Sequence, residues 1–334
     1  MTDKYISLAH GNGGRLMREL IEEMFARHLG NPALDLGADA SRLDWEAGPL
    51  LFTTDGFTVQ PLEFPGGDIG SLAVHGTVND LAVAGARPRY LALNMFIEEG
   101  LETALLERIV ASLGRAAREA GVAVAAGDTK VVRRGEGGGL YLATTGVGTP
   151  LPGPPLGLDR IRPGDRLLVS GPLGDHGTAV LLAREQFGLR GDLRSDAASV
   201  LPLTGAVRGF SGLRFMRDPT RGGLATLCHE IARATGLGVR LRETALPVRD
   251  PVRSVCDMLG YDPLYLACEG RVVAVCAPDQ AGALLDAWRA LPQGAEAALV
   301  GEVEEGHARV VVETAYGGER LLVELEEDPL PRIC

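Results

Sequence analysis

The order of apolar and polar positions in the first half of the chain predicts strands that alternate with helices. Apolar residues spaced for one helical face run through 68–86 and 101–120, and Gly121 follows as a helix-ending residue. Short apolar runs predict strands at 50–55, 89–97, 122–126 and 140–147. We expect the first strand to end in a small polar turn, and the third to lead straight into 127–130. This alternation is typical of a layered α/β or α+β domain.

A second set of elements follows a break at 149–157, which holds four prolines and two glycines. This density excludes a helix or a central strand and predicts a linker. Beyond it we expect a strand at 164–170, a glycine-rich turn at 171–177 and a helix at 178–187. Further helices are expected at 220–235 and 281–291, and strands at 239–242, 272–276, 298–303, 309–312 and 320–325. The chain therefore divides into two α/β units of similar size.

Composition narrows the functional classes. Glycine accounts for 45 of 334 residues, about 13% against a usual ~7%. The glycines form short clusters between apolar runs without a collagen period, which predicts tight turns and loops that can approach phosphate. The net charge is −11. Because nucleic-acid binding needs a basic surface, we predict no nucleic-acid partner.

The cysteines and the lengths of the apolar runs indicate where in the cell the protein is expected. No run approaches the ~18 apolar residues of a membrane span, and the first ten residues lack the apolar core of a signal peptide. We therefore expect a cytoplasmic protein without a membrane partner. The five cysteines form no C-x-x-C pair, which argues against a disulfide framework or a zinc site. Four lie in apolar segments and are expected to be buried, whereas Cys334 ends the sequence.

Two residue types suggest chemistry. Lys4 and Lys130 are the two lysines among 33 basic residues, so Lys130 indicates a use that arginine does not serve, with drift as the alternative. Carboxylates also stand among small residues, at Asp39, Asp55, Asp80, Asp128 and Asp218. Mg²⁺ prefers oxygen ligands and often sits between carboxylates and phosphates. Each aspartate alone is typical of a helix cap or a turn. A cap or turn does not easily explain Asp80, because it lies in the middle of an apolar helix.

Neither a Walker sequence nor a G-x-G-x-x-G after a strand is present. Other motifs resemble, in order along the chain, the HypE family of nickel–iron hydrogenase maturation factors: Gly11-Asn-Gly-Gly14, Phe64-Pro-Gly-Gly67, Asn79-Asp80, Phe96-Ile-Glu-Glu-Gly100, Gly127-Asp-Thr-Lys130, Gly174-Asp-His-Gly177, Asp218-Pro-Thr-Arg-Gly-Gly223, Ala245-Leu-Pro-Val248 and Pro331-Arg-Ile-Cys334. The final motif is very specific. The family belongs to the PurM-like superfamily of aminoimidazole-ribonucleotide synthetase and selenophosphate synthetase.

The resemblance implies a two-domain PurM-like α+β fold. Its N-terminal domain would contribute strands to a β-barrel in a homodimer, followed by a C-terminal α/β domain and a flexible tail. The expected segments are a glycine-containing 1–38, an ATP-binding 39–150, an α/β domain at 151–328 and a mobile 329–334. Prolines in the tail favour an extended chain, which over six residues reaches roughly 19 Å.

The activity that the resemblance implies is ATP-dependent dehydration. HypF would load a carbamoyl group onto Cys334, and this chain would phosphorylate the carbamoyl oxygen with ATP and Mg²⁺. Loss of phosphate would leave a thiocyanate, whose cyanide passes to iron on the HypC–HypD complex. The chemistry suits the substrate, because an amide oxygen leaves poorly and phosphate leaves well.

The resemblance also assigns residues. Cys334, Lys130 and Glu269 would be catalytic, with Glu269 as the base and Lys130 compensating charge on the developing phosphate. These two roles could be coupled. The Mg²⁺ ligands would be Asp39, Asp55, Asp80 and Asp218. The nucleotide contacts would be Asn12, Gly13, Thr54, Asp55, Asn79, Asp80, Gly127, Asp128, Thr129, His176, Asp218 and Thr220.

Several alternatives stay open at this point. His176 either contacts phosphate or caps its turn, and 11–14 either folds over the nucleotide or is flexible. An unassisted thiol is only a few per cent ionised at pH 7, so Cys334 suits a carrier better than a self-activated nucleophile. A selenophosphate-synthetase-like kinase needs a cysteine or selenocysteine and a lysine in that N-terminal segment, which has neither. A non-catalytic scaffold would leave the aspartates and Lys130 unexplained.

Overall fold

The computed structural model describes residues 3–11, 14–36, 38, 40–45, 48–185, 192–326, 330 and 333–334. The chain forms two compact units. Unit 1 comprises Met1–Leu81 and Ala86–Pro150, together with the terminal Ile333 and Cys334. Unit 2 comprises Ala82–Gly85 and the chain from Leu151 to Leu330. Each unit is built on its own sheet.

Unit 1 holds a four-stranded sheet in the order β1-β6-β4-β5. Its strands are β1 (Leu51–Phe57), β4 (Ala86–Glu98), β5 (Ala123–Val132) and β6 (Leu140–Pro150). Only β4 and β5 run parallel, joined by helix α4 (Thr103–Ala120). The two-stranded β2 (Glu63–Phe64) and β3 (Gly67–Asp68) lead into helix α3 (Ile69–Val83). The N-terminal helical segment consists of α1 (Arg15–Glu19), the π-helical η2 (Leu20–Phe25) and α2 (Ala26–Leu29).

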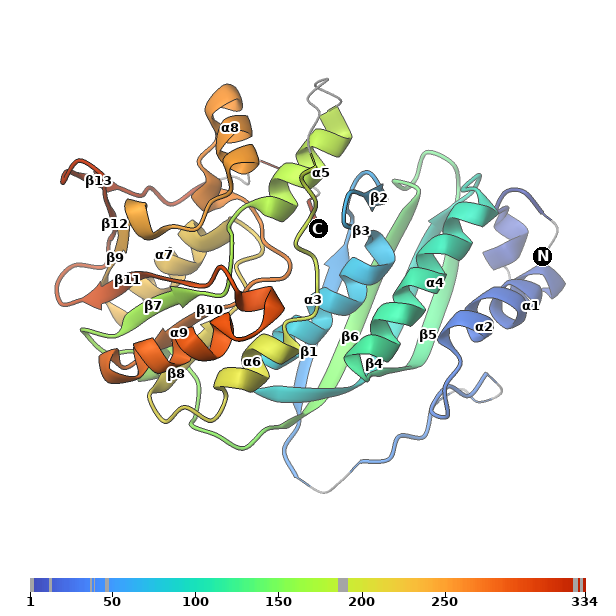
Figure 1. Cartoon of the computed structure of the whole chain (residues 1–334). Coiled ribbons are helices and arrows are strands. Elements are labelled where there is room, and N and C mark those ends of the chain that lie inside the picture. Colours follow the sequence, from blue (N-terminus) through green and yellow to red (C-terminus); the bar gives the residue numbers. More distant parts are fainter. Residues whose placement is uncertain are drawn as a thin grey trace. The chain divides into compact units, whose positions relative to one another are not determined.

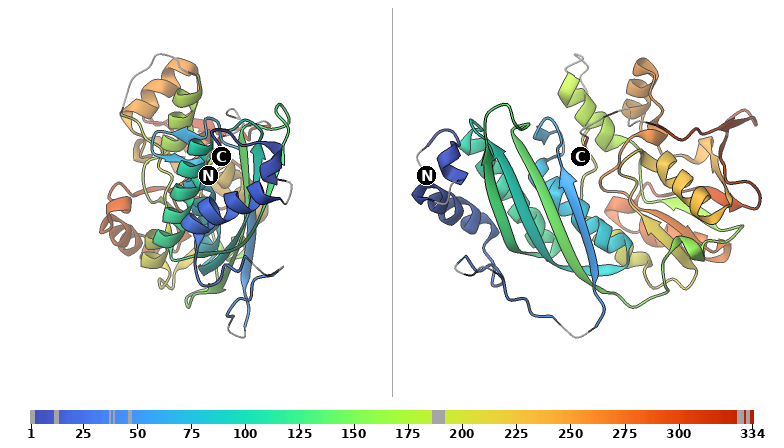
Figure 2. Two further views of the ribbon diagram at one scale, coloured as in Figure 1. Left: turned by 90° about the vertical axis from the view of Figure 1, so that its right-hand side faces the viewer. Right: turned by 180° about the vertical axis from the view of Figure 1, so that it is seen from behind.

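Helices cover one face of this sheet. Along β4 the side chains of Leu91, Leu93, Met95 and Ile97 are buried, whereas the alternate Asn94 and Phe96 are exposed. Successive strand residues point to opposite faces, so the buried set faces α3 and α4 (Figure 1). Seen from behind, none of the described helices covers the opposite face (Figure 2). Unit 1 therefore has one packed and one open sheet face.

Unit 2 holds a seven-stranded sheet in the order β13-β12-β9-β11-β7-β10-β8. The strands are β7 (Arg166–Val169), β8 (Leu213–Arg217), β9 (Gly238–Arg242), β10 (Val273–Cys276), β11 (Ala298–Glu304), β12 (Val310–Glu313) and β13 (Glu319–Leu321). The helices are α5 (Asp175–Glu185), α6 (Leu201–Val207), α7 (Gly223–Thr235), α8 (Asp250–Leu259) and α9 (Ala281–Arg289). Two apolar layers form the core, one with α7 and one with α6 and α9.

Most predicted elements are present, and Gly121 ends α4 in the left-handed region, at φ 68°. Two strands extend beyond their predicted ends: β1 continues to Phe57 where a polar turn was expected, and β5 continues through 127–130 to Val132. Helices α6 and α8, strand β8 and the N-terminal helical segment were not predicted. Mixed helices and sheets confirm the predicted α+β class. Neither the four-stranded nor the seven-stranded sheet closes on itself, so the intersubunit barrel stays a prediction. None of the described helices is long and apolar enough to cross a membrane.

Candidate functional site

Asp55 of β1 and Asp80 of α3 both lie where the strand packs against the helix in unit 1. The Thr53 hydroxyl donates to Asp80 Oδ2 at 2.8 Å, which connects β1 to the last turns of α3. A Cβ added to Gly76 of α3 would stand 2.8 Å from the Phe57 ring and 3.5 Å from Asp55 Oδ2. The missing side chain at Gly76 therefore lets β1 approach α3 with Asp55 beside the helix. The structure thus brings Asp55 and Asp80 to the same strand–helix junction.

Two neighbouring residues of β1 that were predicted to contact the nucleotide point to opposite faces of the sheet. The Thr54 hydroxyl bonds across the ladder to the Thr144 carbonyl at 3.0 Å and faces away from α3, on the open side of the sheet. Asp55 points to the α3 side. Asn79, one residue before Asp80, is fully buried. Alternation along the strand therefore separates two side chains that the sequence placed in one turn.

Asp128 and Lys130 form an ion pair on β5. They are two residues apart, so they share a face, and Lys130 Nζ lies 3.0 Å from Asp128 Oδ2. The hydrogen bond from Lys130 holds the pKa of the Asp128 carboxyl below its usual range. Thr129 between them is buried and points to the opposite face. Because both charged side chains are more than half exposed, the pair contributes little to stability.

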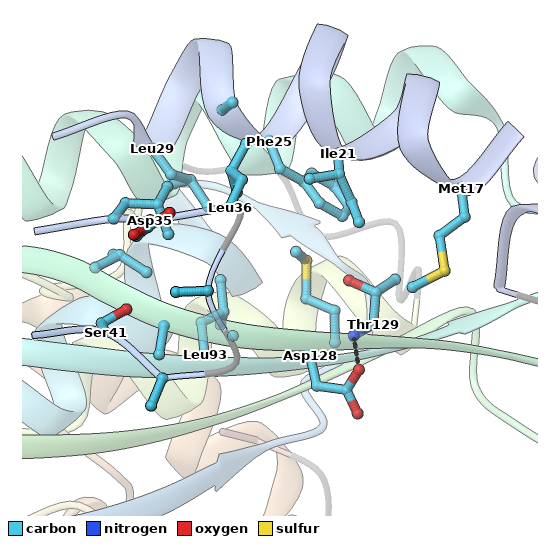
Figure 3. A pocket seen from close by; sticks show the side chains of 18 residues that line it. Met17, Ile21, Phe25, Leu29, Asp35, Leu36, Ser41, Leu93, Asp128 and Thr129 are labelled. Carbon is cyan, nitrogen blue, oxygen red and sulfur yellow. Dashed lines mark hydrogen bonds between the residues drawn. The ribbon is translucent and has the colours of Figure 1, made fainter. Parts of the chain in front are cut away.

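A cavity of about 250 Å³ lies between β4, β5 and the N-terminal helical segment. Gly127, Asp128 and Thr129 line it from the strand, and Met17, Ile21, Phe25, Leu29, Asp35, Leu36, Ser41 and Leu93 are among the residues that close it (Figure 3). Gly127 is needed there, because a Cβ would stand 2.5 Å from the Leu93 carbonyl oxygen of β4. The helical residues were missed because the predicted N-terminal segment contained no helix.

In unit 2, the loop before β10 buries Glu269 beside the turn that carries Asp218. The side chains of both residues are almost fully buried, at 2% and 6% exposure. The Cys268 N–H donates to the Pro219 carbonyl at 3.0 Å, and the Thr220 N–H donates to the Asp218 carbonyl at 3.0 Å. The structure therefore brings together Glu269, Asp218 and Thr220. A buried carboxylate in such a setting is a candidate acid or base.

His176 belongs to the first turn of α5, and it is fully buried. Its Nδ1 lies 2.8 Å from the Ser195 hydroxyl. The next residue's N–H, from Gly177, donates to the Ala267 carbonyl, two residues before Glu269. His176 therefore lies close to the Glu269 loop.

A buried ionic cluster adjoins this loop and was missed by the sequence reasoning. Asp175 is fully buried, and its Oδ2 lies 3.0 Å from Arg249 and 3.6 Å from Arg271. Arg271 also reaches Asp196 at 3.2 Å, and the Glu269 N–H donates to Asp196. Burial, with repulsion from Asp196, raises the pKa of Asp175 to about 6 despite the two arginines. The motif 174–177 contained Asp175, whereas Asp196 and Arg271 carry no local signal.

Cys334 lies against the end of β1 in unit 1. The main-chain N–H of Thr58 donates to the main-chain oxygen of Cys334 at 3.0 Å, and the Thr58 hydroxyl donates to it at 3.2 Å. The preceding Ile333 is 3% exposed, whereas Cys334 is half-buried. The other four cysteines are buried, as predicted. The structure thus describes a docked position for the tail's last residues.

The predicted Mg²⁺ set is not assembled within one unit. Asp39 lies outside the described residues, as do the predicted nucleotide contacts Asn12 and Gly13. Asp55 and Asp80 belong to unit 1, and Asp218 belongs to unit 2. Among the residues that the structure describes, no group of three or more His, Cys, Asp and Glu stands ready to hold a metal ion.

Comparison with known proteins defines the class. Residues 37–149 match the N-terminal domain, and residues 162–313 the C-terminal domain, of AIR synthase related proteins. The chain is therefore a two-domain protein of that class. It is 50% identical over 331 residues to the carbamoyl dehydratase HypE of Azotobacter vinelandii, covering 98% of this chain and 97% of that one. The chain belongs to the HypE family of carbamoyl dehydratases, which are hydrogenase maturation proteins.

Two solved structures support the same placement. A hydrogenase maturation protein HypE crystallised in complex with ATP has a TM-score of 0.94 and 48% identity, covering 98% of this chain and 99% of that chain. A HypE–HypF complex contains a chain with a TM-score of 0.81 and 41% identity, covering 92% and 99%. The predicted family and PurM-like fold are thereby confirmed.

Proposed function

We propose that this chain uses ATP to dehydrate an S-carbamoyl group on Cys334 to a thiocyanate. The observation that carries the proposal is the docking of Cys334 at the end of β1, the strand that bears Asp55. Thr58 follows Asp55 by three residues, which is ~10 Å along an extended strand. A group on the docked sulfur therefore lies near the predicted nucleotide residues of unit 1.

The proposed reaction has two steps, phosphorylation of the carbamoyl oxygen and then elimination of phosphate. The carbamoyl oxygen attacks the γ-phosphorus of ATP, ADP leaves and one N–H proton is lost, which gives an S-bound imidate phosphate. Loss of the remaining N–H proton and of phosphate then forms the C≡N bond. We assign the proton removal to Glu269, whose buried position next to the Asp218 turn suits a base. We assign charge compensation at the phosphate to Lys130.

For ATP we propose a site in unit 1. The cavity beside Gly127–Thr129 is smaller than the roughly 300–1,000 Å³ of pockets that enclose whole ligands, so it suits the base alone. Its apolar lining of Met17, Ile21 and Phe25 favours a flat ring. Support also comes from the relative that was crystallised with ATP. The assignments of Asn12, Gly13, Thr54, His176 and Thr220 remain proposals.

The donor set also suits Mg²⁺. Asp55 and Asp80 offer carboxylate oxygens at one strand–helix junction. Mg²⁺ commonly uses one or two carboxylates together with phosphate oxygens and water, so a three-carboxylate cage is not required. We therefore assign the ion to Asp55 and Asp80, and the roles of Asp39 and Asp218 as ligands stay predictions from the family resemblance. When bound, it would neutralise phosphate charge.

We propose three partners. HypF as carbamoyl donor is supported by the HypE–HypF complex of a relative, and HypC–HypD as cyanide acceptor by the family resemblance. The third is a second copy, through the open face of the unit 1 sheet. Phe52 and Phe96 are 65% and 41% exposed there, and such apolar exposure is typical of interfaces.

We also propose a cytoplasmic location, because the free thiols of Cys228, Cys256, Cys268 and Cys276 are typical of a reducing compartment.

Mass spectrometry of the peptide that carries Cys334 tests the reaction. After carbamoyl loading by HypF, addition of Mg-ATP should remove the mass of one water, because the carbamoyl oxygen leaves with phosphate. A non-hydrolysable ATP analogue should leave the carbamoyl mass in place, and Cys334→Ala should not be loaded. A carbamoyl mass that persists after exposure to ATP would overturn the dehydratase assignment.

A further inference from the structure

Cys334 contacts the end of β1 through its main chain. Both hydrogen-bond donors of Thr58, the backbone N–H and the hydroxyl, point to the main-chain oxygen of Cys334, at 3.0 and 3.2 Å. No part of this contact involves the sulfur atom. These hydrogen bonds therefore do not depend on the group attached to the sulfur. They can form equally with a thiol, an S-carbamoyl group or a thiocyanate.

The residues on either side of Thr58 are closely packed. Thr58 stands between Phe57 and Val59, whose side chains are 1% and 0% exposed. Phe57 packs against α3 at Gly76, where a Cβ would come within 2.8 Å of its ring. Among the strands that the structure describes, β1 pairs with β6 alone and lies at the edge of its sheet. The anchored flanks of Thr58 keep its two donors in a fixed direction.

We propose that Thr58 is a positioning residue, which holds Cys334 beside β1 so that a group on its sulfur is presented to the unit 1 site. The proposal rests on the proposed dehydratase function. It adds a recognition element for the carrier that is distinct from the residues assigned to the chemistry. Loss of the hydroxyl should shift the tail toward undocked positions while leaving the chemical groups in place.

Alkylation of Cys334 measures docking without ATP or carbamoyl loading. The other four thiols are buried, and burial raises the pKa of Cys256 to about 11 and that of Cys276 to about 12. Iodoacetamide at pH 7.5 should therefore modify Cys334 first. Thr58→Val should raise its alkylation rate about fivefold, the effect of losing one hydrogen bond. Thr58→Ser, which keeps the hydroxyl, should restore the wild-type rate.

Two further variants separate docking from general loosening. Thr314→Val removes a hydroxyl that bonds its own turn at Gly318, so it should alkylate at the wild-type rate. Ile333→Asp places a charge on a buried side chain of the tail and should raise the rate without altering β1. Equal alkylation of wild type and Thr58→Val, with unchanged melting temperatures, would overturn the proposal.

A single-turnover assay then tests the positioning role. After loading, Thr58→Val should slow dehydration about fivefold, and Thr58→Ser should restore it. If alkylation rises while the dehydration rate is unchanged, Thr58 holds only a resting tail and the positioning role is wrong. If wild type itself fails to dehydrate, the proposed function fails, and with it the positioning role. The alkylation result then reports the docking contact alone.

Discussion

Lys130 is exposed enough that its role can be tested without unfolding the protein. Its side chain is 58% exposed, and its partner Asp128 is 54% exposed. Such pairs contribute about 0–1 kcal/mol to stability. If Lys130 compensates charge on the phosphate, Lys130→Ala should slow single-turnover dehydration by ~10²–10³-fold. Glu269→Ala should slow it by ~10²–10⁴-fold, through loss of the base. Carbamoyl loading should remain normal in both.

The second lysine supplies the control. Lys4 is exposed, and Lys4→Ala should dehydrate at the wild-type rate. Quenched reactions followed by mass spectrometry measure all three variants. Loss of carbamoyl loading in Lys130→Ala or Glu269→Ala would contradict the assignment, because it would place these residues at the partner interface.

The importance of a single residue could be predicted where its neighbours in the sequence make it unusual. Asp80 was singled out as a carboxylate in an apolar helix, and the structure places it in α3 bonded to Thr53. The docking of Cys334 on Thr58 joins residues 276 positions apart, and no local pattern indicates it. The same holds for Asp196 and Arg271, whose ion pair exists only in the folded chain.

At the scale of elements, strands rich in small residues were the hardest to predict. The segments 53–56 and 127–130 contain glycine, threonine and aspartate, which are typical of turns. Both lie within strands of the sheet. Gly127 shows the physical reason, because β4 approaches so closely that a Cβ would meet the Leu93 carbonyl at 2.5 Å. Tertiary contact thus overrides local preference. Helix α4, with its clear apolar face, was predicted nearly in full.

The first turn of α5 makes stability depend on pH. The carboxyl of Asp175 has a pKa of about 6 in the folded chain, against an ordinary 3.8. Between these values the folded state binds the proton more tightly, so stability falls as pH rises through this window. The full shift corresponds to about 3 kcal/mol. The free energy of unfolding of wild type should therefore fall by about this much, relative to that of Asp175→Asn, as the pH rises from 4 to 7.

Urea unfolding of both proteins at a series of pH values measures this difference. Asparagine keeps the size of the side chain and removes its titration, so the difference isolates the one carboxyl. The attraction of the ionised carboxylate to Arg249 and Arg271 is already contained in its pKa of about 6. Parallel pH profiles of wild type and Asp175→Asn would show that burial does not raise this pKa.

At the scale of the whole molecule, the glycine-rich composition predicted loops that can approach phosphate, without naming the ligand that they bind. The linker prediction at 149–157 falls where the two compact units meet along the sequence, although Pro150 still belongs to β6. Assembly is less predictable from sequence, because alternation indicates which strand face is polar but not what covers it. Phe52, Phe96, Tyr90 and Tyr141 on the open face interrupt that polar pattern.

The open face predicts a homodimer that a single charge should weaken. Phe52 is 65% exposed on β1, and burial of a carboxylate in its place would be costly without a partner charge. Light scattering after gel filtration should therefore give a dimer for wild type and a monomer for Phe52→Glu at low micromolar concentration. Tyr316→Glu changes a fully exposed aromatic residue of unit 2 and should remain dimeric. A wild-type chain that elutes as a monomer would contradict this assembly.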